Sequence, residues 1–295
     1  MDRDTNRYWS SDRFRVDVRR TVGGAQNLLR EVCRISTRLD TSVTYERALK
    51  RAQFLAYELQ SVTVPEDTES ERLDILNRFF FEEKGFRCLP QSESDSAAAY
   101  LFHQVIARRA GAPLVLSLLY AFLADSVGVK LDFVDLNPTC FLRWNDGGRS
   151  RFIDLTRNGR TLTNDELLET LHSRFKITSL PASTVFETLA FENYITDYVM
   201  ALKKTVDPVR DPENLLFLQN TLITYQPSEL PLVGERALLH RRLGNFKLAL
   251  ADLKRYFAFQ DRSRAPMDLV HLYDEMLRLL SPDKLAHSRD DEPST

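Results

Sequence analysis

Residues 114–127 constrain the fold of this chain more than any other segment. The run LVLSLLYAFLADSV is apolar on nearly every side of a helix, so we expect a helix buried on all faces that ends at Gly128. The longer apolar stretch, residues 110–124, is interrupted by Ser117 and Tyr120 and is too short to span a bilayer. The segment therefore predicts the central helix of a globular core.

Immediately after this helix the hydrophobic period changes from helical to alternating. Val129, Leu131 and Phe133 alternate with polar neighbours, and residues 141–143 and 152–154 repeat the pattern, which predicts three short strands. Asn-Asp-Gly-Gly at 145–148 is typical of a hairpin turn. Thr163 followed by Glu166 predicts a capping box and a further helix. The first part of the chain is thus expected to be α+β.

The rest of the chain shows helical periodicity. Before the apolar helix we expect helices up to residue 39, over 45–59, over about 70–84 and over 97–109. After Pro181 the expected helices are 189–202, 213–224, 232–243, 246–259 and 266–280. We therefore divide the chain into a polar N-terminal segment (1–20), an α+β domain (21–180), a helical region (181–280) and a polar tail (281–295).

Composition excludes several classes of function. The net charge is −2 and the pI is about 6.3, so no overall field favours nucleic acid or an acidic membrane surface. The N-terminus lacks the apolar core of a signal peptide. Three widely spaced cysteines fit neither a disulfide framework nor a zinc site, and we expect no metal and no cofactor. The expected location is the cytoplasm. The oligomeric state does not follow from the sequence.

One segment of the helical region has the spacing of a tetratricopeptide unit. In ALLHRRLGNFKLALADLKRYFAFQ, Gly244 stands at the helix–helix turn, Ala249 at the crossing, and Leu253 and Phe257 point inward. Such helix pairs form concave surfaces for peptides, so the expected partner is a protein or peptide bound by this region. An ordinary helical hairpin without a groove is an equal alternative, since only one well-formed unit is found.

Nucleophilic acyl chemistry needs a thiol or hydroxyl near a helix start, a histidine base and a carboxylate that orients the histidine. The chain offers Cys140 and Asp154 on neighbouring expected strands, Ser117 one turn into the buried helix, and His103 on the preceding helix. None of the expected strands contains a histidine.

These segments resemble the SirB-type transglutaminase-like family. The resemblance covers about residues 73–259 and is carried by LNRFFFEEKGFR, LFHQVIARRAGAPLVLSLLYAFLADSVGVKLDFVDLNPTCFLRW and FIDLTRNGRTLTNDEL. It implies a bacterial, cytoplasmic protein with a transglutaminase-like fold followed by a tetratricopeptide-like region. In the superfamily, a cysteine at a helix start acts with a histidine and an aspartate on adjacent strands. On this chain Val115 stands where the SirB pattern has its first serine, and Cys140 stands where the pattern has histidine. Only the aspartate of the pattern is matched, by Asp154.

Two hypotheses follow. In the first, which we favour, the domain is catalytically silent and serves binding or scaffolding, because valine cannot attack a carbonyl and a thiol does not replace imidazole as a base. In the second, Cys140 is the nucleophile of an atypical hydrolase or acyltransferase with His103 as base and Asp154 as orienter. Structural roles are the alternatives to a catalytic role for two of these residues. Asp154 would cap a turn or pair with Arg143 or Arg157, and the Ser117 hydroxyl would bond back to a carbonyl of its own helix.

Other polar groups have structural explanations. His172, His240 and His271 each stand alone on a helix without metal-ligand spacing. Arg241, Arg242, Lys254 and Arg255 are best explained as a solvated helical face. Arg108 and Arg109 fit the basic last turn of a helix.

Overall fold

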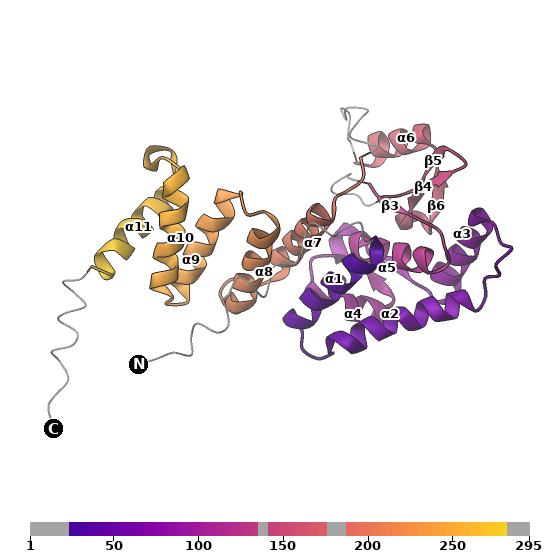
Figure 1. Ribbon diagram of the computed structural model, residues 1–295, viewed down its shortest axis with the longest axis horizontal. Coiled ribbons are helices and arrows are strands. Elements are labelled where there is room, and N and C mark those ends of the chain that lie inside the picture. Colours follow the sequence, from indigo (N-terminus) through magenta and orange to yellow (C-terminus); the bar gives the residue numbers. More distant parts are fainter. Residues whose placement is uncertain (1–23, 135–140, 176–186, 282–295) are drawn as a thin grey trace, which may run out of the picture.

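The computed structural model describes residues 24–134, 141–175 and 187–281; Cys140 therefore lies outside the described residues. An N-terminal assembly of helices with a small sheet continues into a row of helices, α7 to α11, that extends away from it (Figure 1). The α+β fold class and the all-helical C-terminal region are both confirmed. Among the described residues, we find no helix whose length and hydropathy would let it span a bilayer.

The central apolar helix is α5 (Pro113–Ser126), and its ten residues from Val115 to Ala124 are all buried. Pro113 stands in the first turn, where its missing N–H costs nothing. The helices around it are α1 (Ala25–Leu39), α2 (Tyr45–Gln60), α3 (Glu69–Asn77), the π-helical turn η3 (Arg78–Glu83) and α4 (Phe102–Arg108). The helix expected over 97–109 is shorter than predicted, because a 3-10 turn at Ala97–Ala99 precedes α4.

The sheet has four antiparallel strands in the order β3 (Asp132–Phe133), β4 (Phe141–Asp146), β5 (Arg149–Asp154) and β6 (Arg160–Leu162). Gly147 and Gly148 both have positive φ, 53° and 89°, as a tight hairpin turn requires, so the predicted hairpin is confirmed. Phe141 is the residue opposite Asp154. Strand β6 and the two-residue parallel pair β1 (Arg87–Cys88) and β2 (Ala110–Gly111) were not predicted, since such short strands cannot show alternation.

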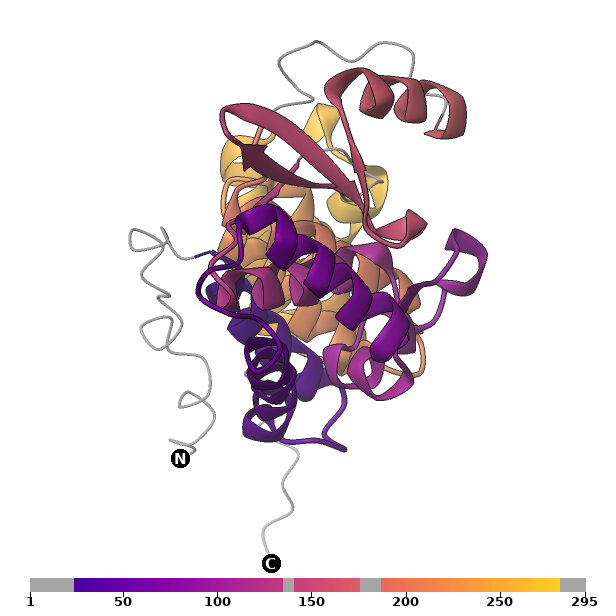
Figure 2. The same cartoon turned by 90° about the vertical axis from the view of Figure 1, so that its right-hand side faces the viewer.

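Helix α6 (Asn164–Phe175) covers one face of the sheet. The predicted capping box is present: the Glu166 amide donates to the Thr163 hydroxyl at 3.3 Å, and the Thr163 amide donates to the Glu166 carboxylate at 2.8 Å. The sheet and α6 form a layer above the helices (Figure 2). A small core joins them, made of Val134, Phe141, Phe152, Leu162, Leu167 and Leu171.

The main hydrophobic core continues from α1 through α5 into α7 (Phe191–Thr205) and α8 (Pro212–Tyr225). Three tyrosine hydroxyls of α7 and α8 form hydrogen bonds across this contact. Tyr198 is hydrogen bonded to Ser36 at 2.8 Å, and Tyr225 donates to the carboxylate of Glu31 at 2.8 Å. Tyr194 donates to the Leu114 carbonyl at 2.6 Å. Helices α7 and α8 are therefore built into the core of the first domain.

Helices α9 (Leu230–Arg242), α10 (Phe246–Phe259) and α11 (Met267–Leu279) enclose a core of their own. Gly244 has a φ of 74° at the α9–α10 turn, and Ala249 is fully buried where the two helices meet. The Arg236 guanidinium binds the Asp252 carboxylate with two hydrogen bonds, at 2.8 and 2.6 Å. The predicted helical hairpin is thus present.

Candidate functional site

The start of α5 is where a transglutaminase-like nucleophile would stand. Strand β2 brings the chain there, and Gly111 is required because a Cβ would lie 2.6 Å from a methyl group of Val105. Val115 is fully buried. The Ser117 hydroxyl donates to the Leu114 carbonyl at 2.7 Å, as its mid-helix position predicts. The same carbonyl accepts the Tyr194 hydroxyl.

Asp154 ends β5 and is 1% exposed. One carboxylate oxygen accepts the amide and hydroxyl of Thr156 at 2.9 and 2.6 Å, which caps the 3-10 turn η6 (Leu155–Arg157). The other oxygen accepts Arg174 at 3.1 Å, and the Arg157 guanidinium lies 3.8 Å away. Of the two predicted cation partners, Arg157 is confirmed, whereas Arg143 pairs with Asp132 at 2.7 Å instead. The carboxylate is therefore held as a structural cap.

His103 lies on α4, is 2% exposed and faces α1. Its Nε2 is 2.9 Å from the Asp40 carboxylate, while its Nδ1 is buried and has no hydrogen-bond partner among the described residues. Hydrogen bonds from the Ser42 amide, and then from His103, lower the pKa of Asp40 well below its usual range. His103 is thus oriented by Asp40.

The structure does not bring His103 and Asp154 together. Helix α4 and the sheet lie on different sides of α5 (Figure 1), and each of the two side chains has its own partners. The third residue of the hypothetical triad, Cys140, lies outside the described residues. Within those residues, no three His, Cys, Asp or Glu side chains gather to bind a metal ion. Among the described residues, His103 and Asp154 therefore do not form the His–Asp pair that a catalytic triad requires.

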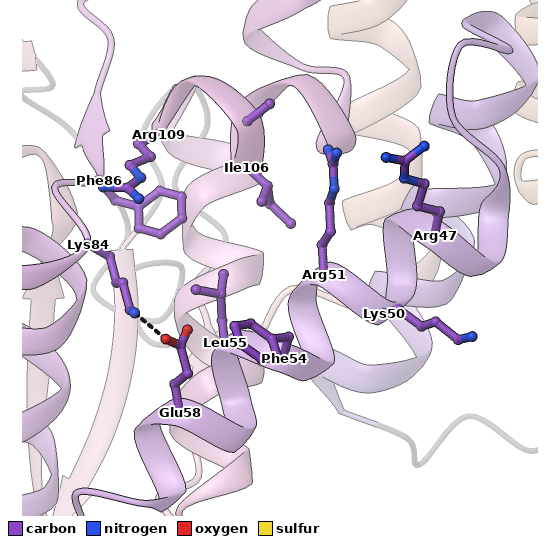
Figure 3. Close-up of a pocket in the computed structure, with 11 residues that line it drawn as sticks. Arg47, Lys50, Arg51, Phe54, Leu55, Glu58, Lys84, Phe86, Ile106 and Arg109 are labelled. Carbon is purple, nitrogen blue, oxygen red and sulfur yellow. Dashed lines mark hydrogen bonds and ion pairs between the residues drawn. The ribbon is translucent and has the colours of Figure 1, made fainter.

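A second feature, which sequence reasoning missed, is a groove of about 790 Å³ between α2 and the C-terminal end of α4. We call it the α2 groove. Figure 3 shows its lining residues: Arg47, Lys50, Arg51, Phe54, Leu55, Glu58, Lys84, Phe86, Ile106, Ala107 and Arg109. The only signal in the sequence was the spacing of three cations, 47, 50 and 51, on one helix. Lys84, Phe86 and the residues at the end of α4 come from separate segments.

Arg109 reaches this groove from an unusual backbone position. It follows α4 in the left-handed conformation, with φ 53° and ψ 30°, where glycine or asparagine is more common. Its carbonyl accepts the Arg87 amide at 3.0 Å, so the β1–β2 pairing fixes the turn. The predicted basic last turn is present, but Arg109 itself lies one residue beyond the helix.

Comparison with known proteins finds similarity over part of this chain. A family model described as the Transglutaminase-like superfamily matches residues 46–189. F-box only protein 21 of Pongo abelii is 30% identical over 95 residues, which are 32% of this chain and 15% of that protein. The Mus musculus and Homo sapiens proteins of that name are each 30% identical over 89 residues, or 14% of their length. No solved structure gives a significant match. Residues 46–189 are therefore similar to the transglutaminase-like superfamily.

Proposed function

We propose that this transglutaminase-like domain is catalytically silent, that the chain belongs to the SirB-type branch of the superfamily, and that it binds a partner protein in the cytoplasm through its helical C-terminal region. The observation that carries the first part is the start of α5. A buried valine occupies the expected nucleophile position, and the nearby Ser117 hydroxyl donates to the Leu114 carbonyl. Neither arrangement presents an attacking atom to a substrate.

The carboxylate and imidazole support the same proposal. A catalytic aspartate must accept a hydrogen bond from the histidine base to hold it in the correct tautomer. Asp154 instead caps a turn and balances the charge of Arg174, and the imidazole of His103 is bound to Asp40. The alternative, a hydrolase or acyltransferase that uses Cys140 with these two residues, gains no support from this geometry.

Exposed apolar side chains support binding by the helical region. Phe259 at the end of α10 is 77% exposed, and Met267 at the start of α11 is 64% exposed. Six large apolar side chains of α10 and α11 are exposed altogether: Phe246, Leu248, Phe259, Met267, Leu277 and Leu279. Exposed side chains of this size can supply the apolar contacts of an interaction site. The helical pair α9–α10 would then act as a tetratricopeptide-like unit that α11 completes.

The catalytic half is tested by acyl transfer. The full chain is incubated with a glutamine-containing peptide and a fluorescent primary amine, and separately with a casein substrate for peptidase activity. We expect no turnover above that of the buffer. Thiol-dependent turnover that Cys140→Ala abolishes would refute the silent domain and establish the cysteine enzyme.

The binding half is tested by affinity purification from the native cell with the intact chain and the double variant Phe259→Ser/Met267→Ser. We expect loss of a specific protein from the double variant. The control is Val209→Ser, because Val209 is 78% exposed outside α9–α11. Partners that are unaffected by the double variant would contradict binding at this surface.

A further inference from the structure

The α2 groove combines an apolar floor with unpaired positive charge. Leu55 and Phe86 are buried, and Ile106 is half-buried. Within the described residues, the guanidinium groups of Arg47, Arg51 and Arg109 form no ion pair. In Figure 3 the side chains of Arg47 and Arg51 point the same way from α2, and Arg109 lies beside the Phe86 ring. An anion entering the groove would therefore meet three unpaired cations.

The unpaired guanidinium groups lie on both sides of the apolar floor, with Arg47 and Arg51 on α2 and Arg109 beyond the Phe86 ring (Figure 3). The Lys84 ammonium is bound to the Glu58 carboxylate at 2.6 Å, so this pair adds no net charge. A ligand with carboxylates beside an apolar side chain fits both the cations and the floor, whereas a phosphate backbone alone would leave the apolar floor uncovered. Guanidinium groups bind carboxylates through paired hydrogen bonds, which favours such a ligand.

The length of the groove sets the size of the ligand. The lining residues of α2 run from Arg47 to Glu58, a helical distance of about 16 Å at 1.5 Å per residue. An extended peptide covers this distance with about five residues. The groove is open to solvent, so a segment of a longer chain can lie in it without threading.

We propose that the α2 groove binds an acidic segment of a partner protein. Carboxylates of the segment pair with Arg47, Arg51 and Arg109, and one apolar side chain packs on Leu55, Phe86 and Ile106. This site lies on the transglutaminase-like domain and does not depend on binding by the helical region. The two proposals can therefore fail separately.

The test uses three fluorescein-labelled octapeptides, in which a Glu-Glu pair and a phenylalanine are separated by one, two or three alanines. Fluorescence anisotropy measures their binding to the full chain. We expect saturable binding of at least one peptide, weakened as salt rises. The corresponding peptides with glutamine in place of glutamate should bind at least about tenfold more weakly, because charge-assisted hydrogen bonds are lost.

Variants locate the binding. Arg47→Ala/Arg51→Ala should weaken it at least about tenfold. The control, Lys247→Ala/Lys254→Ala, removes two exposed charges from α10 and should leave the dissociation constant within about twofold. Arg109→Gly is informative because glycine suits the left-handed backbone, so a loss of binding in that variant is not a loss of fold.

Three results would overturn the proposal. The first is no saturable binding of any of the peptides up to about 1 mM. The second is binding that the Arg47 and Arg51 substitutions leave unchanged. The third is tighter binding of a fluorescein-labelled twelve-nucleotide DNA strand through the same arginines, which would assign the groove to nucleic acid.

Discussion

The hydroxyl of Tyr198 completes a buried chain of hydrogen bonds that joins α1, α4 and α7. The Phe102 amide donates to the Ser36 hydroxyl at 3.0 Å, Ser36 is bonded to Tyr198 at 2.8 Å, and Tyr198 donates to the Tyr100 carbonyl at 3.2 Å. Since Ser36 and Tyr198 each have one proton, the bonds must run in this one direction. Ser36 thereby satisfies an amide in the first turn of α4 that no helical carbonyl can reach.

Tyr198→Phe removes two of these bonds and leaves the Ser36 hydroxyl proton and the Tyr100 carbonyl without partners. Each neutral bond contributes about 0.5–1.5 kcal/mol net, and each stranded buried group costs about 1–3 kcal/mol. Tyr198 is fully buried, so water cannot replace the partner. We expect the free energy of unfolding to fall by about 2–4 kcal/mol. Urea unfolding followed by circular dichroism measures this change.

A double-mutant cycle tests the reasoning more sharply than the single variant. Ser36→Ala also breaks the Ser36–Tyr198 bond, so the sum of the two single losses should exceed the loss in the double variant by about 1–2 kcal/mol. In the control cycle, Tyr120→Phe takes the place of Tyr198→Phe beside Ser36→Ala, because the Tyr120 hydroxyl donates to Asn77 and shares no partner with Ser36. Additivity of Ser36→Ala and Tyr198→Phe to within about 0.5 kcal/mol would refute the hydrogen-bond chain.

Three further predictions concern a turn, a carboxylate and a thiol. Gly159→Ala should lower the free energy of unfolding by more than about 2 kcal/mol, since Gly159 has a φ of 74° and the added Cβ would lie 2.0 Å from the Asn77 amide oxygen. The control is Gly85→Ala, at a φ of 68° with open space around it, which should cost about 1 kcal/mol. Thermal unfolding measures both changes. The pKa of Asp40 is lowered in the fold, so its stabilisation is present above pH 4 and is lost as the pH falls below that value. Asp40→Asn should therefore be less stable than the wild type at pH 7, and the difference between the urea midpoints should begin to narrow as the pH falls below 4. A difference that stays constant would contradict this. Burial raises the pKa of Cys33 to about 12, so in a variant whose other cysteines are serine a disulfide reagent should react only after denaturation.

Local patterns predicted the elements that local sequence determines. The all-apolar helix, the Gly147–Gly148 hairpin and the Thr163–Glu166 capping box are confirmed, because each depends on residues a few positions apart. The capping role of Asp154 was one of the alternatives that the sequence left open, and its bonds to Thr156 favour that role.

Features assembled from distant segments could not be predicted in this way. The α2 groove needs residues of α2 beside Lys84 and Arg109, and no periodicity links them. Asp40 became the partner of His103 across 63 residues, in a bond that depends on how α4 packs on α1. The two-residue strands β1 and β2 exist only because tertiary packing brings them side by side.

The joining of α7 and α8 to the first core has a consequence for synthesis on the ribosome. Glu31 on α1 and its partner Tyr225 on α8 are 194 residues apart. At about 5–20 residues per second, Tyr225 leaves the ribosome about 10–40 s after Glu31 does. During this interval the apolar face of α1 lacks its final cover, so the nascent chain presents a surface that chaperones recognise. Completion of the amino-terminal core must then wait for helices encoded far downstream.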